Sequence, residues 1–210
     1  MKSEERKRKF LLASTGGSGC GYLLRYFYHL LSVKGETHWI ASENFFHVLK
    51  QEFSLDWQNI NANEISRNIS TFFNEKPSAE QNHSFKIYDH KNIKANPASG
   101  TSNYEAMIIL PCSMKTLASI ASGVAANLID RAADVALKEK RKLILVVRET
   151  PYNLIHIENM KKVTLAGGVI LPASPGFYHH PKSVNDIYDF IVDRIFRQIG
   201  IDKTLVSYEE

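Results

Sequence analysis

Residues 10–21 read FLLASTGGSGCG, and this stretch decides the fold that the sequence predicts. The apolar run 10–14 is typical of a buried strand, and it passes directly into glycine-rich residues 15–21 at the start of a helical pattern over 19–33. Glycines at such a turn let backbone N–H groups approach an anion, which the helix N-terminus also attracts. The spacing matches neither G-x-G-x-x-G nor G-K-[ST], so a mononucleotide fits better than NAD, with a plain tight turn as the alternative.

Short apolar runs alternate with helical patterns along most of the chain. Further strands are expected at 37–42, 84–89, 105–110, 142–147 and 168–171, and further helices at 43–51, 114–121, 128–140, 152–165 and 183–199. The alternation predicts an α/β fold, a Rossmann-like or flavodoxin-like doubly wound and mostly parallel sheet with helices on both faces. Residues 52–83 interrupt it, and we expect an irregular surface excursion with one short helix there.

The composition predicts one folded domain. With 210 residues, 44% of them hydrophobic, the chain divides into a basic tail 1–9, a domain 10–201 with a variable segment at 52–95, and a tail 202–210. The net charge of +4 comes mainly from residues 2–9, so the rest is nearly neutral and is not expected to bind nucleic acid. No apolar run is long enough to span a membrane, and no signal peptide is expected. Cys20 and Cys112 are expected to be reduced. These expectations together predict a cytoplasmic protein.

Polar residues follow several of the predicted strands, at the edge where open α/β sheets bind ligands. Ser42 follows the second strand, and the fourth leads into residues 113–116, whose hydroxyls and free amides can hold a phosphate or a flavin edge. The alternative makes Ser113 a helix N-cap and Cys112 a small buried hydrophobe, and for Cys112 we favour this alternative. Arg148 and Glu149 follow the fifth strand, a costly place for two charges without a ligand, unless they form a local salt bridge.

Two of the predicted helices carry charges that need explaining. In 128–140, Arg131, Asp134 and Lys138 share one face, for which a surface ion network is the simple explanation. In 183–199, Arg194 lies beside the apolar stripe and therefore needs a partner anion or a neighbouring subunit.

No metal site is predicted. The acids at 186, 189 and 193 do not form a paired magnesium-binding motif and are expected to make a solvated helix face. His179 and His180 have no further ligand at a suitable spacing.

Longer motifs identify a family. They are TGGSG at 15–19, PASGTS at 97–102, PCSMKTLASIASG at 111–123, NLIDRAADVALKEKRKLILVVRETP at 127–151, IHIENM at 155–160 and GGVILPASPGFYHHPKSVNDIYDFIVDRI at 167–195. In this order they closely resemble the UbiX-like flavin prenyltransferase family. The resemblance is nearly continuous over 97–201, fair over 10–50 and weak over 52–95. Such an ordered series is far more specific than any single motif.

The resemblance implies a metal-independent enzyme that joins a dimethylallyl group from dimethylallyl phosphate to N5 and C6 of reduced FMN. The prenylated flavin then serves a partner UbiD-type decarboxylase, and the enzyme is a homo-oligomer of twelve chains with shared active sites. One alternative is an FMN-dependent decarboxylase of the related Cys-containing flavoprotein group, which typically carries an Ala-Asn-Thr version of the motif at 113–116. Another is a non-catalytic FMN carrier, which would leave Lys138, Arg148 and Arg194 without a purpose.

The resemblance also implies roles for single residues. The flavin-binding residues that it implies are Gly16, Gly17 (alanine in the family), Ser18, Ser42, Ser113, Met114, Lys115, Thr116 and Arg131. The residues that it implies for binding the phosphate of the prenyl donor are Lys138, Arg148, Tyr178 and Arg194. Glu149 matches an acid beside that phosphate and Glu52 an acid near the flavin, so the catalytic group comprises Glu149, Lys138, Arg148, Ser18 and Glu52. Cys20 and Gly21 depart from the family by replacing larger or more usual residues.

Overall fold

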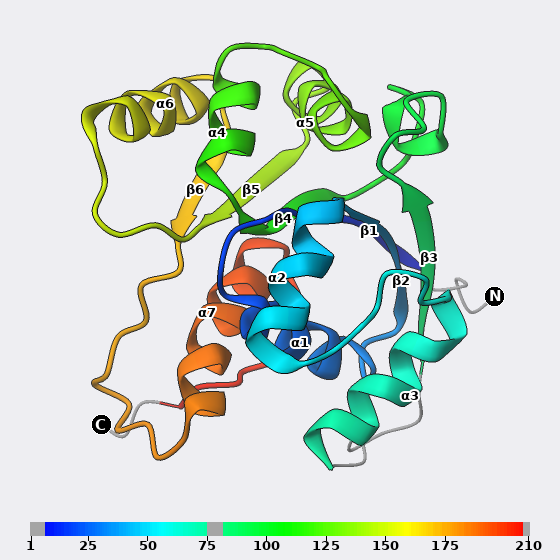
Figure 1. Cartoon of the computed structure of the whole chain (residues 1–210), viewed down its shortest axis with the longest axis vertical. Coiled ribbons are helices and arrows are strands. Elements are labelled where there is room, and N and C mark those ends of the chain that lie inside the picture. The colour runs from blue at the N-terminus through cyan, green and yellow to red at the C-terminus, as the bar shows by residue number, and fades with distance from the viewer. Residues whose placement is uncertain (1–6, 75–81, 208–210) are drawn as a thin grey trace, which may run out of the picture.

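The computed structural model describes residues 7–74 and 82–207, and its centre is one six-stranded sheet (Figure 1). Its strands are β1 (Arg8–Ser14), β2 (Gly35–Ala41), β3 (His83–Asp89), β4 (Ala106–Cys112), β5 (Lys142–Val147) and β6 (Val169–Pro172). They follow the order β3-β2-β1-β4-β5-β6, and every neighbouring pair is parallel. The predicted α/β class is confirmed, and the sheet is wholly rather than mostly parallel.

Helices cover both faces of the sheet, as predicted. They are α1 (Cys20–Leu30), α2 (Glu43–Phe53), α3 (Ala62–Phe73), α4 (Met114–Ala121), α5 (Leu128–Lys138), α6 (Leu154–Leu165) and α7 (Val184–Gln198). Side chains alternate along each strand, so Phe10 and Leu12 of β1 pack towards α1, α2, α3 and α7, whereas Leu11 and Ala13 pack towards α4, α5 and α6. In the part of the chain that the structure describes, no helix is long and apolar enough to cross a membrane.

The strand order reverses between β1 and β4, which is where doubly wound sheets bind ligands. Two loops meet at this point. The amide of Thr15 donates to Pro111 O at 3.1 Å, and the amide of Ser113 donates to Thr15 Oγ1 at 2.8 Å. The glycine turn after β1 is thereby joined to the residues that follow β4.

Residues 52–74 and 82–83, the described part of the predicted irregular excursion with one short helix, differ from that prediction. They contain α3, a regular helix of twelve residues with a capping box between Asn61 and Glu64. Ile65 and Ile69, four residues apart, are fully buried against the core. The apolar spacing was present in the sequence, but the surrounding polar residues concealed it.

The acids of α7 also differ from the prediction, because Asp189 and Asp193 are buried rather than solvated. Asp189 accepts hydrogen bonds from Arg25 Nη2 at 2.6 Å and from His29 Nε2 at 2.8 Å, both on α1. Burial alone would raise the pKa of Asp189, but these bonds hold it below its ordinary value. The periodicity of α7 could not show that Arg25 and His29 of α1 lie against it.

Candidate active site

An open pocket of about 180 Å³ lies at the carboxyl edge of the sheet, beside the switch point. It gathers predicted flavin-binding residues from the ends of three strands: Gly16, Ser42, Ser113, Lys115 and Thr116. Two helices begin here, because Ser42 accepts from the amide of Phe45 at the start of α2, and Ser113 accepts from the amide of Thr116 at the start of α4. The pocket therefore combines hydroxyl groups, one lysine and the positive ends of two helix dipoles, a set that suits a phosphate ester.

Further residues line this pocket to which the sequence analysis assigned no role, among them Asn44, His90, Asn127 and Asp130. Asp130 is buried, and it accepts from Asn127 Nδ2 at 3.0 Å and from Ser119 Oγ at 3.1 Å. Burial raises the pKa of its carboxyl. Asn127 and Asp130 could have been found from the sequence, because Asn127 stands at an N-cap position three residues before an acid. His90 lies within the variable segment 52–95, which carries no such indication.

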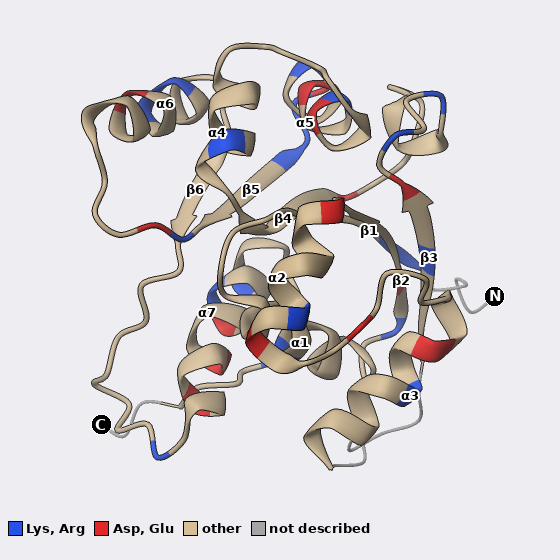
Figure 2. Cartoon of the chain, viewed as in Figure 1, with Lys and Arg blue, Asp and Glu red and all other residues tan. Residues whose placement is uncertain are grey.

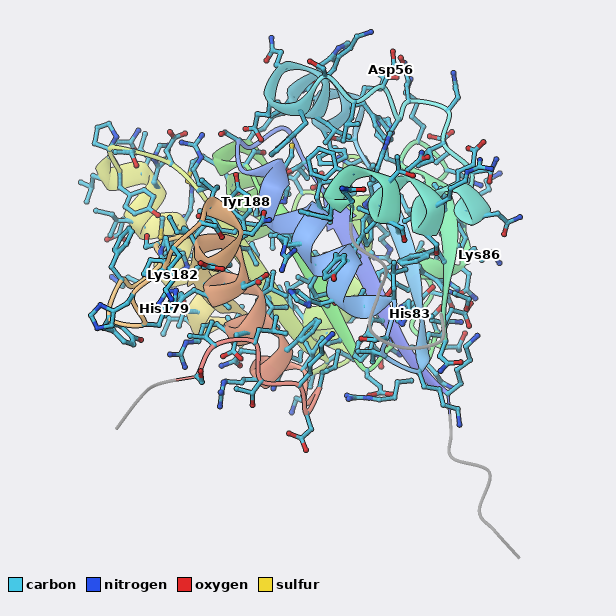
Figure 3. The ribbon with its side chains drawn as sticks, turned by 90° about the horizontal axis from the view of Figure 1, so that it is seen from below. Asp56, His83, Lys86, His179, Lys182 and Tyr188 are labelled. Atoms are coloured by element: carbon cyan, nitrogen blue, oxygen red, sulfur yellow. The ribbon has the colours of Figure 1, made fainter. Side chains whose placement is uncertain are left out.

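The glycine turn tolerates side chains unequally. A Cβ atom at Gly16 would lie 2.8 Å from Cβ of Asn44, whereas one at Gly17 would make only ordinary contacts, 3.5 Å from Cys112. An alanine, as the family resemblance implies at this position, would therefore also fit at position 17. A Cβ at Gly21 would lie 2.3 Å from Cζ of Tyr188, a residue of α7 that Figure 3 labels. The Tyr188 ring packs edge-on against Tyr22 at 5.0 Å between centroids. The small residue at position 21 makes room for this tyrosine of α7.

We expect Gly21→Ala to lower the free energy of unfolding by about 1–3 kcal/mol, because the tyrosine ring cannot yield by a small shift. Gly17→Ala is expected to change it by less than about 0.5 kcal/mol. Urea unfolding measures both, and Tyr188→Val should remove most of the cost of Gly21→Ala. An equal cost for Gly21→Ala with and without Tyr188 would contradict this explanation.

Three of the residues assigned to catalysis, Ser18, Glu52 and Arg148, lie around the start of α1. Glu52, on α2, accepts from the amide of Gly19 at 2.9 Å and from the amide of Cys20 at 2.8 Å, so its carboxylate caps α1. Arg148 Nε donates to the carbonyl oxygen of Ser18 at 3.3 Å. Glu149 follows, and its Oε1 accepts from the amide of Thr150 at 3.0 Å. Each charged side chain thus has a backbone partner at the ligand edge.

The residues assigned to the prenyl phosphate are not brought together within one chain. Arg194 Nη2 donates to Tyr178 Oη at 3.2 Å, and its guanidinium lies over the ring of Phe190. Lys138 is at the other end of β5 from Arg148, and six residues of strand span about 20 Å. The phosphate residues therefore form separate groups in the chain.

The helix α5 carries the ion pairs in a different combination from the predicted network. Arg131 pairs with Asp134 at 2.7 Å, as expected, but Lys138 pairs with its neighbour Glu139 at 2.5 Å. Basic and acidic segments alternate along α5 and α6 (Figure 2).

Met114 and Cys112 are buried in the core next to the pocket, and the interpretation of Cys112 as a buried hydrophobe is confirmed.

Comparisons with known proteins agree with this geometry. A family model described as Flavoprotein matches residues 1–196. The flavin prenyltransferase UbiX of Methanocaldococcus jannaschii is 38% identical over 197 residues, which cover 94% of this chain and 96% of the relative.

Two solved structures are similar over nearly the whole chain. AnUbiX (PadA1), in complex with FMN and dimethylallyl pyrophosphate, superposes with a TM-score of 0.79 at 33% identity and covers 97% of this chain and 100% of its own. A dodecameric FMN-dependent UbiX-like decarboxylase from Escherichia coli O157:H7 gives a TM-score of 0.76 at 33% identity, covering 91% of this chain and 94% of its own. The chain therefore belongs to the flavoprotein family and, within it, to the UbiX flavin prenyltransferases.

Proposed function

We propose that this protein joins a dimethylallyl group from dimethylallyl phosphate to N5 and C6 of reduced FMN, releases phosphate, and supplies prenylated FMN to a UbiD-type decarboxylase. The observation that carries the proposal is the pocket at the switch point, which is lined in part by the glycine turn that Glu52 of α2 and Arg148 contact. The similar AnUbiX was solved with FMN and a dimethylallyl pyrophosphate. We place the protein in the cytoplasm, because both cysteines are free and buried.

The pocket fits FMN by its donors. The hydroxyls of Ser42, Ser113 and Thr116 and the amides at the starts of α2 and α4 would hold the flavin phosphate, with Lys115 adding a positive charge. Gly16 and Gly17 leave the turn above β1 without side chains, so a ring system can approach the backbone. Reduced FMN supplies the nucleophilic atoms of the reaction.

The remaining residues act on the prenyl phosphate. Negative charge grows on the phosphate as its C–O bond to the allyl group breaks, and Arg148, Lys138 and Arg194 stabilise that charge. The hydroxyl of Tyr178, already bonded to Arg194, donates to a phosphate oxygen. Glu149 exchanges a proton with the phosphate as a general acid or base. In the proposed reaction these cations take the place of a metal ion.

We infer that the site is completed by neighbouring chains of a homo-oligomer, proposed to have twelve chains. Lys138 and Arg148 are separated by the length of β5, so one chain cannot place both on a single phosphate. The surface offers an interface: Leu154, Ile155 and Leu165 of α6 are 71%, 69% and 79% exposed. Apolar groups exposed to this degree are typical of subunit contacts.

Incubation without air with reduced FMN and dimethylallyl phosphate tests the proposal, with the mass of the extracted flavin as the readout. We expect the mass of the flavin to increase by one isoprene unit, and we expect the same increase when a metal chelator is present. A parallel reaction with the diphosphate identifies the preferred donor. An unchanged flavin mass, from folded protein that binds FMN, would overturn the proposal in favour of a decarboxylase or an FMN carrier.

A further inference from the structure

A partly buried group of polar side chains on β2, β3 and the segment before β4 has no part in the site described above. At its centre is His38 of β2, which is 2% exposed. Its Nε2 lies 2.6 Å from Glu36 Oε1, and its Nδ1 lies 2.8 Å from Tyr104 Oη and 3.0 Å from Tyr88 Oη. Tyr104 Oη also donates to Asn96 Oδ1 at 3.0 Å. Tyr104, which lies just before β4, thereby joins the sheet to the segment that begins at Asn96.

The protons of this group can be assigned. Nε2 of His38 donates to the Glu36 carboxylate, which makes Nδ1 an acceptor. Burial lowers the pKa of His38, and Lys9 and Lys86 lower it too, although Glu36 opposes them, so the ring is neutral at neutral pH. Tyr88 Oη then donates its proton to Nδ1, and Tyr104 Oη donates its single proton to Asn96 Oδ1. With the protons placed in this way, the hydrogen bond from Tyr104 is the one that reaches Asn96.

Residues 96–102 form a closed turn on this anchor. The amide of Ser99 donates to Asn96 O at 3.1 Å, and the amide of Ser102 donates to Ser99 O at 3.2 Å. Ser102 is 4% exposed, and its hydroxyl donates to the backbone carbonyl of Asn96. On the far side of the turn, Arg141 donates to the carbonyl oxygen of Gly100. Hydrogen bonds at Asn96 and at Gly100 thus hold the turn on two sides.

The tip of the turn lies against Lys138. A Cβ atom on Gly100 would be 3.1 Å from Lys138 Nζ and 2.6 Å from Glu139 Oε1, so the backbone of the turn lies directly beside the ends of these two side chains. Ser99 and Thr101 flank the glycine, and their hydroxyls are hydrogen-bonded to each other at 2.8 Å. The turn therefore adds two hydroxyl groups and backbone amides to the surroundings of a lysine that our proposed function assigns to the prenyl phosphate.

We propose that Tyr104 is a positioning residue for the prenyl phosphate: through its hydrogen bond to Asn96 it holds the 96–102 turn against Lys138. The inference rests on the proposed function. His38 lies four residues before Ser42, about 13 Å along the strand from the flavin pocket. Loss of the anchor should therefore weaken binding of the prenyl donor and leave FMN binding intact.

Tyr104→Phe removes one hydroxyl and keeps the buried ring. We expect KM for dimethylallyl phosphate to rise about fivefold, the effect of losing one neutral buried hydrogen bond, with kcat and FMN affinity unchanged. Asn96→Ala should act similarly, and the double variant should be no worse than either single one, because all three break the same link. The matched control is Tyr26→Phe on α1, whose buried hydroxyl has no hydrogen-bond partner among the described residues. It should leave KM unchanged.

Amide hydrogen exchange tests the anchor without flavin or prenyl donor. The amides of Ala98, Ser99 and Ser102 are bonded within the turn, and we expect them to exchange about fivefold faster in Tyr104→Phe but not in Tyr26→Phe. Unchanged exchange in Tyr104→Phe would overturn the anchor even if the protein makes no prenylated flavin. Faster exchange in a protein that makes prenylated flavin with an unchanged KM would overturn the link to the prenyl phosphate.

Discussion

Replacing Glu149 with glutamine should lower turnover by about 10²–10⁴ while FMN still binds, the usual loss when a general acid or base is removed. The substitution keeps the size of the side chain, and the amide oxygen can still accept the bond that the Thr150 amide now donates to Glu149 Oε1 at 3.0 Å. What disappears is the ability to exchange a proton with the phosphate. The measurement is the rate of prenylated-flavin formation against donor concentration, with an FMN titration alongside.

A matched control separates chemistry from charge. Glu105, which pairs with Arg8 at 2.9 Å, precedes β4 and so lies at the opposite edge of the sheet from Glu149. Glu105→Gln removes the same charge and should leave turnover within about twofold of the wild type, as expected for a surface pair. Circular dichroism confirms that both variants fold. Turnover close to wild type in Glu149→Gln would show that this acid only orients its surroundings, and the proton-transfer role would be dropped.

The fold and the pocket at the switch point could be predicted from the sequence because their signals are local. A glycine turn directly after an apolar run marks the end of β1, and Ser42 and Ser113 follow the ends of other predicted strands. In a parallel sheet all such ends meet at one edge. Gly16, Ser42, Ser113, Lys115 and Thr116 therefore line one pocket, although they come from three strand ends.

The rest depended on contacts between distant elements. The periodicity of a helix shows which of its faces is apolar, but not what packs against it, so nothing in α7 revealed that Asp189 meets Arg25 of α1, 164 residues away. The contact between His38 and Tyr104 likewise brings together residues 66 positions apart. Glu52 was assigned only through the family resemblance, and its contact with the glycine turn became visible when α2 was placed beside α1.

Mixing two impaired variants should restore activity if the active site is shared between chains. Lys138→Ala should raise KM for the donor about 10–100-fold, the value of one charge-assisted bond to the phosphate, and leave FMN binding intact. Glu149→Gln should retain donor binding and lose turnover. Because β5 separates the two residues by about 20 Å within one chain, a phosphate that contacts both must take them from different chains.

Random co-assembly of the two variants in equal amounts then gives about a quarter of the sites an intact residue from both chains, because each of two independent positions is filled correctly half of the time. Activity at low donor concentration should recover to about that fraction, while each variant assembled with itself stays impaired. Light scattering must show that the mixed oligomer has the mass of the wild type. A co-assembled oligomer without recovery would place both residues in one chain, and a stable, fully active monomer would remove the shared site altogether. Recovery requires that a neighbouring chain bring its Lys138 to the carboxyl edge of β5, which the fold of one chain forbids and a symmetric oligomer permits.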